Sequence, residues 1–340
     1  MTDTATPDLP PFAQGAINLA SARLGAKGLY ATDDFFAPLD RMLQDEPAVW
    51  REDVYDDNGK WMDGWESRRK RVPGHDWSIV RLAMPGRIFG FDVDTSYFTG
   101  NYPPHCSIEA AFVESGDPTD ATEWTELLTK SPLGPSAHHY FEVADKQKVW
   151  THLRMHIYPD GGVARLRVYG AAYFDWAKVG AEDEVDLAYI FNGAKSLAWS
   201  DAHYGHPDKM LGPGRGLNMG DGWETKRRRG PGHDWAVIRL GHPGRIERVV
   251  VDTAFFKGNF PDTCELLGAD LSGHADSLSD AEIAASENWK PILPRQKLQM
   301  DHIHEYGPGV VADIGRVTHV RFAMHPDGGV MRLRLFGRKA

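Results

Sequence analysis

The sequence predicts an all-β protein made of two tandem jelly-roll β-sandwich domains with few short helices. Two observations predict this class. The same blocks of sequence occur twice and in the same order, and most of them are short β-branched runs separated by glycine and proline. With 340 residues, the chain is long enough for two domains that each bury a core.

The repeat is clearest in residues 63–103 and 221–261, where 24 of 41 aligned positions are identical. A second block, THLRMHIYPDGGVARLRVYG, begins at Thr151 and matches THVRFAMHPDGGVMRLRLFG, which begins at Thr318. Two copies are too few for a solenoid, so they indicate a domain pair. We expect an N-terminal arm over 1–14, a first repeat over 15–172, a linker over 173–189 and a second repeat over 190–340.

The elements within each repeat follow from local patterns. WSIVRL and WAVIRL, at 77–82 and 235–240, are expected strands that end at Pro-Gly turns, and 245–256 is a longer strand. The PDGG segments predict tight hairpins over 151–170 and 318–337. Short helices are expected over 35–44 and 278–289, the latter capped by Ser279 with Glu282 three residues later.

Composition excludes several classes of protein. A net charge of −10 argues against a general nucleic-acid or anionic-membrane binder, and no apolar run is long enough for a transmembrane helix. The acidic, proline-rich N-terminus does not resemble a signal peptide. Cys106 and Cys264 occupy equivalent positions and are expected to be buried, reduced and not catalytic. We therefore expect a cytoplasmic protein.

Arginine and histidine alternate along the expected hairpins. The period of two places them on one face of the sheet, opposite the apolar side chains. Such a face can be solvated, but a row of guanidinium groups also suits the binding of a carboxylate. The residues are His152, Arg154, His156, Arg165 and Arg167 in the first repeat and His319, Arg321, Arg332 and Arg334 in the second.

The DGWE and PGHDW motifs combine acids, bases and imidazoles in both repeats. They can bind a polar anion and move its protons. The alternatives are that the tryptophans belong to the core and that each aspartate caps a turn. The candidate catalytic residues are Glu66, His75 and Asp76 in the first repeat and Glu224, His233 and Asp234 in the second.

We consider a metal site because the chain has 15 histidines. His302 and His304 alternate in DHIHEY, but in the first repeat only His139 aligns, with His304. There is no HExxH motif, cysteine pair or aspartate-rich loop, so we assign no metal ligands and no cofactor. A weakly bound divalent ion stays an alternative. His139 and His304 are kept as candidates for substrate binding.

The repeated DGWETKRRRGPGHDWAVIRLGHPGRI, VDTAFFKGNFP and THVRFAMHPDGGVMRLRLFG motifs, with their first-repeat partners, resemble the allantoicase family over nearly the whole chain. The resemblance implies two jelly rolls of the galactose-binding-like type. It also implies hydrolysis of allantoate, a carboxylate with two ureido groups, to ureidoglycolate and urea, a step of purine degradation.

On this interpretation the arginines clamp the carboxylate, the histidines transfer protons and a glutamate acts as base if burial raises its pKa. His156 is replaced by Ala323 and Tyr158 by His325 in the second repeat, so the two sites are not equivalent. The small molecule is the expected partner, together with further copies of the chain in a homo-oligomer. The main alternative is a non-enzymatic tandem ligand-binding module; another is a metal-dependent ureidohydrolase.

Overall fold

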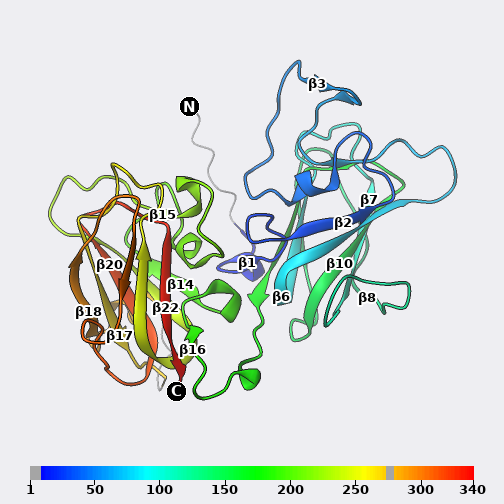
Figure 1. Ribbon diagram of the computed structural model, residues 1–340. Helices are drawn as coiled ribbons and strands as arrows, with labels where there is room; N and C mark the ends of the chain where they lie inside the picture. The colour runs from blue at the N-terminus through cyan, green and yellow to red at the C-terminus, as the bar shows by residue number, and fades with distance from the viewer. Residues whose placement is uncertain (1–8, 273–278) are drawn as a thin grey trace. The chain divides into compact units, whose positions relative to one another are not determined.

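The structure is a computed structural model that describes residues 9–272 and 279–340 (Figure 1). It divides into two compact units, Met1–Tyr173 and Phe174–Ala340. Most of the expected N-terminal arm and the first residue of the expected helix over 278–289 lie outside the described residues. No helix in the described part of the chain is long and apolar enough to cross a membrane.

Each unit is built from strands and very short helices. The elements of the first unit are η1 (Pro11–Ala13), β1 (Ile17–Asn18), β2 (Lys27–Ala31), η2 (Leu39–Leu43), β3 (Tyr55–Asp56), β4 (Gly59–Lys60), β5 (Trp65–Glu66), β6 (Asp76–Asp94), β7 (His105–Ala111), β8 (Thr125–Pro132), β9 (His138–Glu142), β10 (Val149–Tyr158), β11 (Gly162–Val163) and β12 (Arg165–Ala172).

The described part of the second unit repeats the order of the strands without counterparts of β3 and β4, and it has more short helices. Its elements are η3 (Trp176–Lys178), β13 (Val185–Asp186), η4 (Ile190–Asn192), β14 (Lys195–Trp199), η5 (Pro207–Leu211), η6 (Met219–Asp221), β15 (Trp223–Glu224), β16 (Asp234–Asp252), β17 (Thr263–Ala269), α1 (Asp280–Ala285), β18 (Lys290–Lys297), β19 (Ile303–Tyr306), β20 (Val317–His325), β21 (Gly329–Val330) and β22 (Arg332–Lys339). The expected linker 173–189 therefore carries η3 and β13, and β13 pairs with β22.

One long strand organises each unit. The first half of β6 pairs with β2 and β10, and its second half pairs with β12 and β9. The strand therefore belongs to both layers of the sandwich, and β16 does the same in the second unit. This arrangement confirms the predicted all-β class with two jelly-roll sandwiches.

Two local predictions are wrong. Pro85 and Gly86 do not end a strand, because β6 runs through them; its register with β10 shifts there, and its other partner changes from β2 to β12. The expected hairpin over 151–170 does not form either, since β10 and β12 pair with different halves of β6. The same holds for β20 and β22. Alternation identifies the faces of a strand, but it does not say which neighbour the strand pairs with.

The two predicted helices have different outcomes. Only Leu39–Leu43 of the segment 35–44 is helical, as a 3-10 turn, because Pro38 disfavours a helical conformation in the residue before it. In α1 the Ser279 hydroxyl accepts a hydrogen bond from the Glu282 amide, which confirms the predicted cap.

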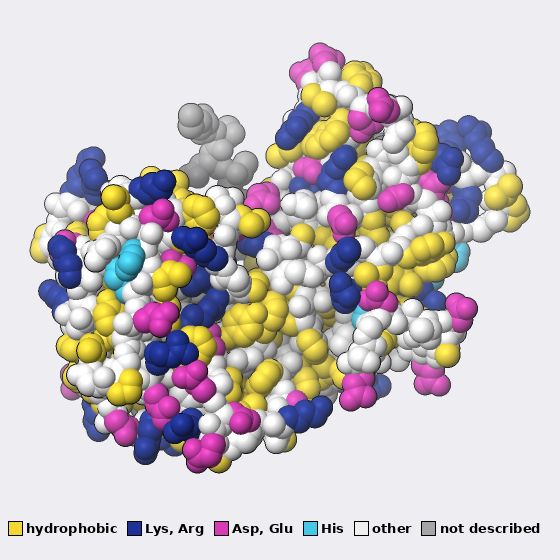
Figure 2. All heavy atoms as spheres, viewed as in Figure 1, with side chains coloured by type: hydrophobic (Ala, Val, Ile, Leu, Met, Phe, Trp, Pro, Cys, Tyr) yellow, Lys and Arg dark blue, Asp and Glu magenta, His cyan; other side chains and the backbone are white. Residues whose placement is uncertain are grey.

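Each core is filled by large apolar side chains and one cysteine. Cys106 and Cys264 are fully buried and free, as predicted, and burial raises the pKa of each thiol to about 12. Basic and acidic side chains are interspersed over the face of the molecule seen in Figure 2. The largest buried apolar side chains include Trp65, Phe91 and Phe98 in the first unit and Trp223, Phe256 and Phe322 in the second.

Candidate active site

In the first unit a basic loop, residues 67–75, carries His75 to the start of β6. The carboxylate of Asp76 is buried and accepts hydrogen bonds from the Thr32 hydroxyl (2.8 Å) and the Lys70 ammonium. The Lys70 amide also donates to Asp160 (2.8 Å). Asp76 therefore anchors the loop, and His75 is held beside the end of β10.

The second unit has the same arrangement of hydrogen bonds around its basic loop. Asp234 is buried and accepts hydrogen bonds from the Ser200 hydroxyl (2.9 Å) and the Arg228 guanidinium, while the Arg228 amide donates to Asp327 (2.8 Å). His233 is thereby held at the position equivalent to His75. Both predicted catalytic aspartates thus position a histidine and have structural partners of their own.

A hydrogen-bonded chain extends inward from His75. Its Nε2 lies 2.9 Å from Nδ1 of His156, and Nε2 of His156 lies 2.9 Å from Oε2 of Glu109. The Nε of Arg154 donates to the same glutamate oxygen at 2.6 Å. The arrangement is a carboxylate that orients one imidazole, which in turn orients a second, as in catalytic triads.

The protonation states of this chain are set by its surroundings. Burial, helped by the charges of His156 and Lys70, lowers the pKa of His75. Burial acts to raise the pKa of Glu109, but the hydrogen bonds and charges of Arg154 and His156 hold it below its usual value. Near neutral pH the chain therefore has an ionised carboxylate at its inner end and a neutral imidazole at its outer end.

His75 opens onto a pocket of about 400 Å³, a size that suits a small molecule. The Lys130 ammonium lies 4.4 Å from the ring centroid of Tyr158, and this ring lies 4.4 Å from that of His75. The lining therefore combines a cation, which can bind an anionic ligand, with groups that can hold or transfer a proton. The lining residues are Gly74, His75, Pro104, His105, Lys130, Tyr158 and Pro159.

The corresponding place in the second unit holds a different cluster. One ligand atom each from His233, Glu265 and His325 lies within 4.8 Å of the other two. The Nε2 of His325 is 3.0 Å from Oε1 of Glu265, and the rings of the two histidines are 4.3 Å apart. The Nη2 of Arg295 lies 3.2 Å from Nδ1 of His325. Burial lowers the pKa of His233, as it does for His75.

The two clusters differ by one pleat along two neighbouring strands. Glu265 aligns with Ser107, and Ser107 lies two residues before Glu109 on the same face of β7. His325 aligns with Tyr158, which lies two residues after His156 on β10. Both changes move the ionisable groups toward the end of the sheet that carries the basic loop. The first unit therefore has an inward chain of bonds, and the second has three groups that converge.

The glutamates of the DGWE motif have their own partners. Oε1 of Glu66 accepts a hydrogen bond from Asn101 (2.7 Å), and Oε1 of Glu224 accepts one from Asn259 (2.5 Å). Burial raises the pKa of Glu66, which the Asn101 bond partly offsets. A glutamate was expected to act as a base if burial raises its pKa, and Glu66 meets this condition. Its carboxylate, however, bonds to Asn101 and not to His75.

The arginines that alternate with apolar residues on β10, β12, β20 and β22 are divided between the two layers. Arg165 and Arg332 are buried and donate to backbone carbonyl groups of loops, such as that of Glu46 (2.8 Å) and that of Asp221 (2.8 Å). Their guanidinium groups hold these loops, so we do not include them in the proposed site.

Arg167 and Arg334 also have partners within their own units. Arg167 lies 3.5 Å from a carboxylate oxygen of Asp92, and Arg334 lies 3.6 Å from one of Asp186. We leave both out of the proposed site for the same reason.

Arg154 and Arg321 lie on the layer that carries the histidine clusters. Arg154 contacts Glu109 and lies 4.7 Å from the ring centroid of Trp124. Arg321 lies 4.7 Å from that of Trp235. Of the predicted clamp residues, Arg154 joins the chain of His75 through Glu109, and Arg321 lies on the equivalent strand of the second unit.

His139 of β9, which is half-buried, and His304 of β19, which is buried, connect backbone segments. Nε2 of His139 accepts a hydrogen bond from the Gly134 amide (2.7 Å), and its Nδ1 lies 2.8 Å from the Val93 carbonyl oxygen. His304 repeats this pattern with Gln299 (2.8 Å) and Val251 (3.0 Å). Both ring nitrogens are used, so these residues join the second half of the long strand to the loop that precedes β9 or β19.

Sequence reasoning missed Glu109, Glu265 and Lys130. A signal was present for the two glutamates, since each is a lone carboxylate in the otherwise largely apolar strands HCSIEAA and TCELLGA. Their positions do not align between the repeats, so a search for shared residues passes over them. Lys130 is a single exposed lysine on a polar strand, and nothing in the sequence distinguishes it.

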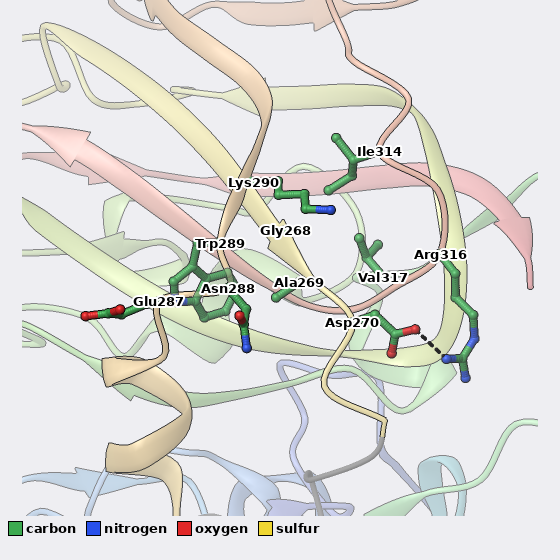
Figure 3. A pocket seen from close by; sticks show the side chains of 10 residues that line it. All are labelled: Gly268, Ala269, Asp270, Glu287, Asn288, Trp289, Lys290, Ile314, Arg316 and Val317. Carbon is green, nitrogen blue, oxygen red and sulfur yellow. Dashed lines mark hydrogen bonds and ion pairs between the residues drawn. The ribbon is translucent and has the colours of Figure 1, made fainter.

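A separate hollow lies at the other end of β17 (Figure 3). It is bordered by the ion pair of Asp270 and Arg316, with 2.7 Å between the nearest atoms, and by Asn288 and Lys290. Its strand residues lie several positions from Glu265, so it is distinct from the histidine cluster.

The fold and these sites define a class: proteins of two similar jelly-roll units, each with a histidine cluster at the start of its long strand. The family model for the allantoicase repeat matches residues 17–173 and 185–340. The chain therefore belongs to the allantoicase family.

Individual proteins agree with the family model. The chain is 56% identical to a probable allantoicase of Stutzerimonas stutzeri, with 95% of this chain and 96% of that protein covered. It is 54% identical to one of Rhizobium meliloti, with 98% and 96% covered. The crystal structure of allantoicase from Saccharomyces cerevisiae superposes with a TM-score of 0.78 at 36% identity, with 95% and 93% of the two chains covered.

Proposed function

We propose that this protein hydrolyses allantoate to ureidoglycolate and urea, and that its first unit carries out the chemistry with His75. Family membership over both units supports the reaction. The observation that supports the choice of unit is the bonded chain from Glu109 through His156 to His75, which ends at an open pocket with a lysine.

The substrate carboxylate binds to the Lys130 ammonium, because an ionised pair of this kind forms a strong hydrogen bond. Lys130 is exposed and close to the Tyr158 ring, so it reaches a ligand over His75 with little rearrangement. The two ureido groups provide donors and acceptors for the other polar groups of the pocket.

The neutral imidazole of His75 acts first as a base. It takes a proton from water as the water oxygen bonds to the central carbon and the bond from that carbon to one ureido nitrogen breaks. The imidazolium then returns the proton to the departing nitrogen, which leaves as urea. One water is consumed, and no net proton is gained or lost.

His156 and Glu109 are positioning residues. The Glu109 carboxylate holds His156, which orients the His75 ring and stabilises the imidazolium that forms during the reaction. Arg154 keeps Glu109 ionised and in place.

The test uses purified protein and allantoate, with urea and ureidoglycolate measured separately. We expect equal amounts of the two products, and His75→Ala should lower kcat by about 10²–10⁴-fold. Cys106→Ser is the control, since its thiol is buried away from the pocket. Binding of allantoate without urea release would favour the non-enzymatic ligand-binding module instead.

A cytoplasmic location and a homo-oligomeric state remain proposals. Cell fractionation and the mass of the purified protein in solution test them directly.

A further inference from the structure

We propose that His233, Glu265 and His325 of the second unit bind one divalent transition-metal ion. The proposal rests on the second unit alone and goes beyond the proposed function, because the hydrolysis assigned to His75 does not require it. The three side chains come from the basic loop, β17 and β20, so the fold and not a local sequence motif brings them together.

The donor set suits a particular class of ion. Two imidazoles and one carboxylate favour zinc, cobalt or a similar first-row ion, whereas magnesium and calcium prefer oxygen ligands alone. Three protein ligands leave further coordination positions for water or an anion. We therefore expect an open site rather than a closed structural one.

The geometry is close to that of a bound site. Ligand atoms at about 2.1 Å from one ion lie at most about 4.2 Å apart. The three groups already lie within 4.8 Å of one another, and His325 and Glu265 are 3.0 Å apart. All three are half-buried, so a small side-chain movement closes the site while solvent still reaches it.

One cation has to move aside for the ion. The Nη2 of Arg295 lies 3.2–3.3 Å from the two ring nitrogens of His325. The Arg295 side chain is 57% exposed, so it can turn into solvent at little cost. Once displaced, it is placed to attract an anion that completes the coordination of the ion.

The first unit offers the comparison that makes the proposal specific. There Ser107 and Tyr158 occupy the positions of Glu265 and His325, and Nε2 of His75 is already bonded to His156. Two of the three ligands are thus replaced, and we expect no ion at that place.

The experiment measures metal binding by the full-length chain without a histidine tag. After treatment with chelator, the protein is titrated with Co²⁺ and its visible absorption is recorded. Bound Zn²⁺ is then counted by elemental analysis after gel filtration. We expect one ion per chain and the absorption of a cobalt site with nitrogen and oxygen ligands.

The matched variants are Glu265→Ser and His325→Tyr, which introduce the residues of the first unit. Each should weaken binding by more than the roughly 10–100-fold that loss of an outer-shell partner costs. Cys264→Ser should bind as the unmodified protein does, because its thiol is buried and not a ligand. Circular dichroism checks that each variant is folded.

Two results would overturn the proposal: an unmodified protein that retains no ion after gel filtration, or a folded His325→Tyr variant with unchanged affinity. Urea release measured on the same samples reports on the proposed function separately, so failure of one does not imply failure of the other.

Discussion

The two units share a frame but differ in how their ionisable groups are arranged on it. In both, a buried aspartate anchors the basic loop and holds a histidine at the start of the long strand. Glu109 and His156 lie one pleat further from this loop than Glu265 and His325 do. A displacement of two residues on two adjacent strands turns a chain of hydrogen bonds into a convergent cluster. The two units thus share the aspartates that anchor the basic loop and differ in the arrangement of their other ionisable groups.

Breaking the chain of bonds in the first unit should have the largest effect. His156→Ala introduces the residue of the second unit, Ala323, and removes the link between Glu109 and His75. We expect kcat to fall by about 10²–10³-fold, because the base is then no longer oriented. His156→Asn, which can retain a bond to His75, should recover part of the loss. An unchanged kcat in the folded His156→Ala variant would refute the role of the chain.

Removing the pocket lysine should have an intermediate effect. Loss of a charge-assisted contact in Lys130→Gln should raise KM by roughly 10- to 150-fold, with a smaller change in kcat. The charge of Lys130 also helps to lower the pKa of His75, so its loss should raise that pKa. The acid limb of the profile of kcat/KM against pH should therefore move to higher pH. If the acid limb of this profile lies at the same pH in Lys130→Gln and in the unmodified protein, a group other than His75 is the base.

The two units should also differ in how much stability they lose at acid pH. Burial lowers the pKa of His319 to about 4. The unfolded chain binds a proton on this residue below about pH 6.5 and the folded unit does not, so stability falls as the pH drops from 6.5 toward 4. At pH 5 the loss is about 2 kcal/mol.

Burial also lowers the pKa of the equivalent His152 in the first unit, where the Asp117 carboxylate, 3.8 Å from Nε2, opposes the effect. Asp270 and Asp280 oppose it at His319 as well, but there burial lowers the pKa to about 4 all the same. The second unit should therefore lose more stability between pH 7 and pH 5. Hydrogen exchange followed separately in peptides of each unit measures this, and His319→Leu should remove the difference. Equal losses in the two units would contradict the assignment.

The cysteines should show the smallest difference between the units. Cys106 and Cys264 are both buried in the core, so Ser in place of either should cost about 1 kcal/mol of stability and leave kcat unchanged. Thermal melting and urea release test the two statements. A fall in kcat for folded Cys264→Ser would show that a thiol takes part in the reaction.

The sequence was sufficient for the fold class because that depends on repeated strand patterns and on glycine and proline between them. It was not sufficient for strand partners. The alternation in THLRMHIY and RLRVYG identified the faces of β10 and β12 correctly, but both strands pair with β6 rather than with each other. Alternation is a local property, whereas pairing depends on which layer of the core each strand completes.

The residues of the proposed sites were predicted only in part, because repetition and alternation are local properties of the sequence. His75 and His233 of the proposed sites were selected because their motif is repeated, and Arg154 and Arg321 because they alternate with apolar residues. Arg165 and Arg332 follow the same alternation but are buried against loop carbonyl groups. Only the three-dimensional arrangement distinguishes an arginine on the layer of the histidine clusters from one that donates hydrogen bonds to the carbonyl groups of a loop.

The long strand β6 has a consequence for how the chain folds during synthesis. Its partners lie between residues 27 and 172, so the sandwich closes late and the unit has the non-local contacts of a slow folder. All these partners precede the second unit, and residues 173–252, up to the end of β16, take roughly 4–16 s to synthesise at typical rates. The first unit can therefore complete its sheet before β16 leaves the ribosome. This order of events lowers the risk that two similar long strands exchange partners while both are unfolded.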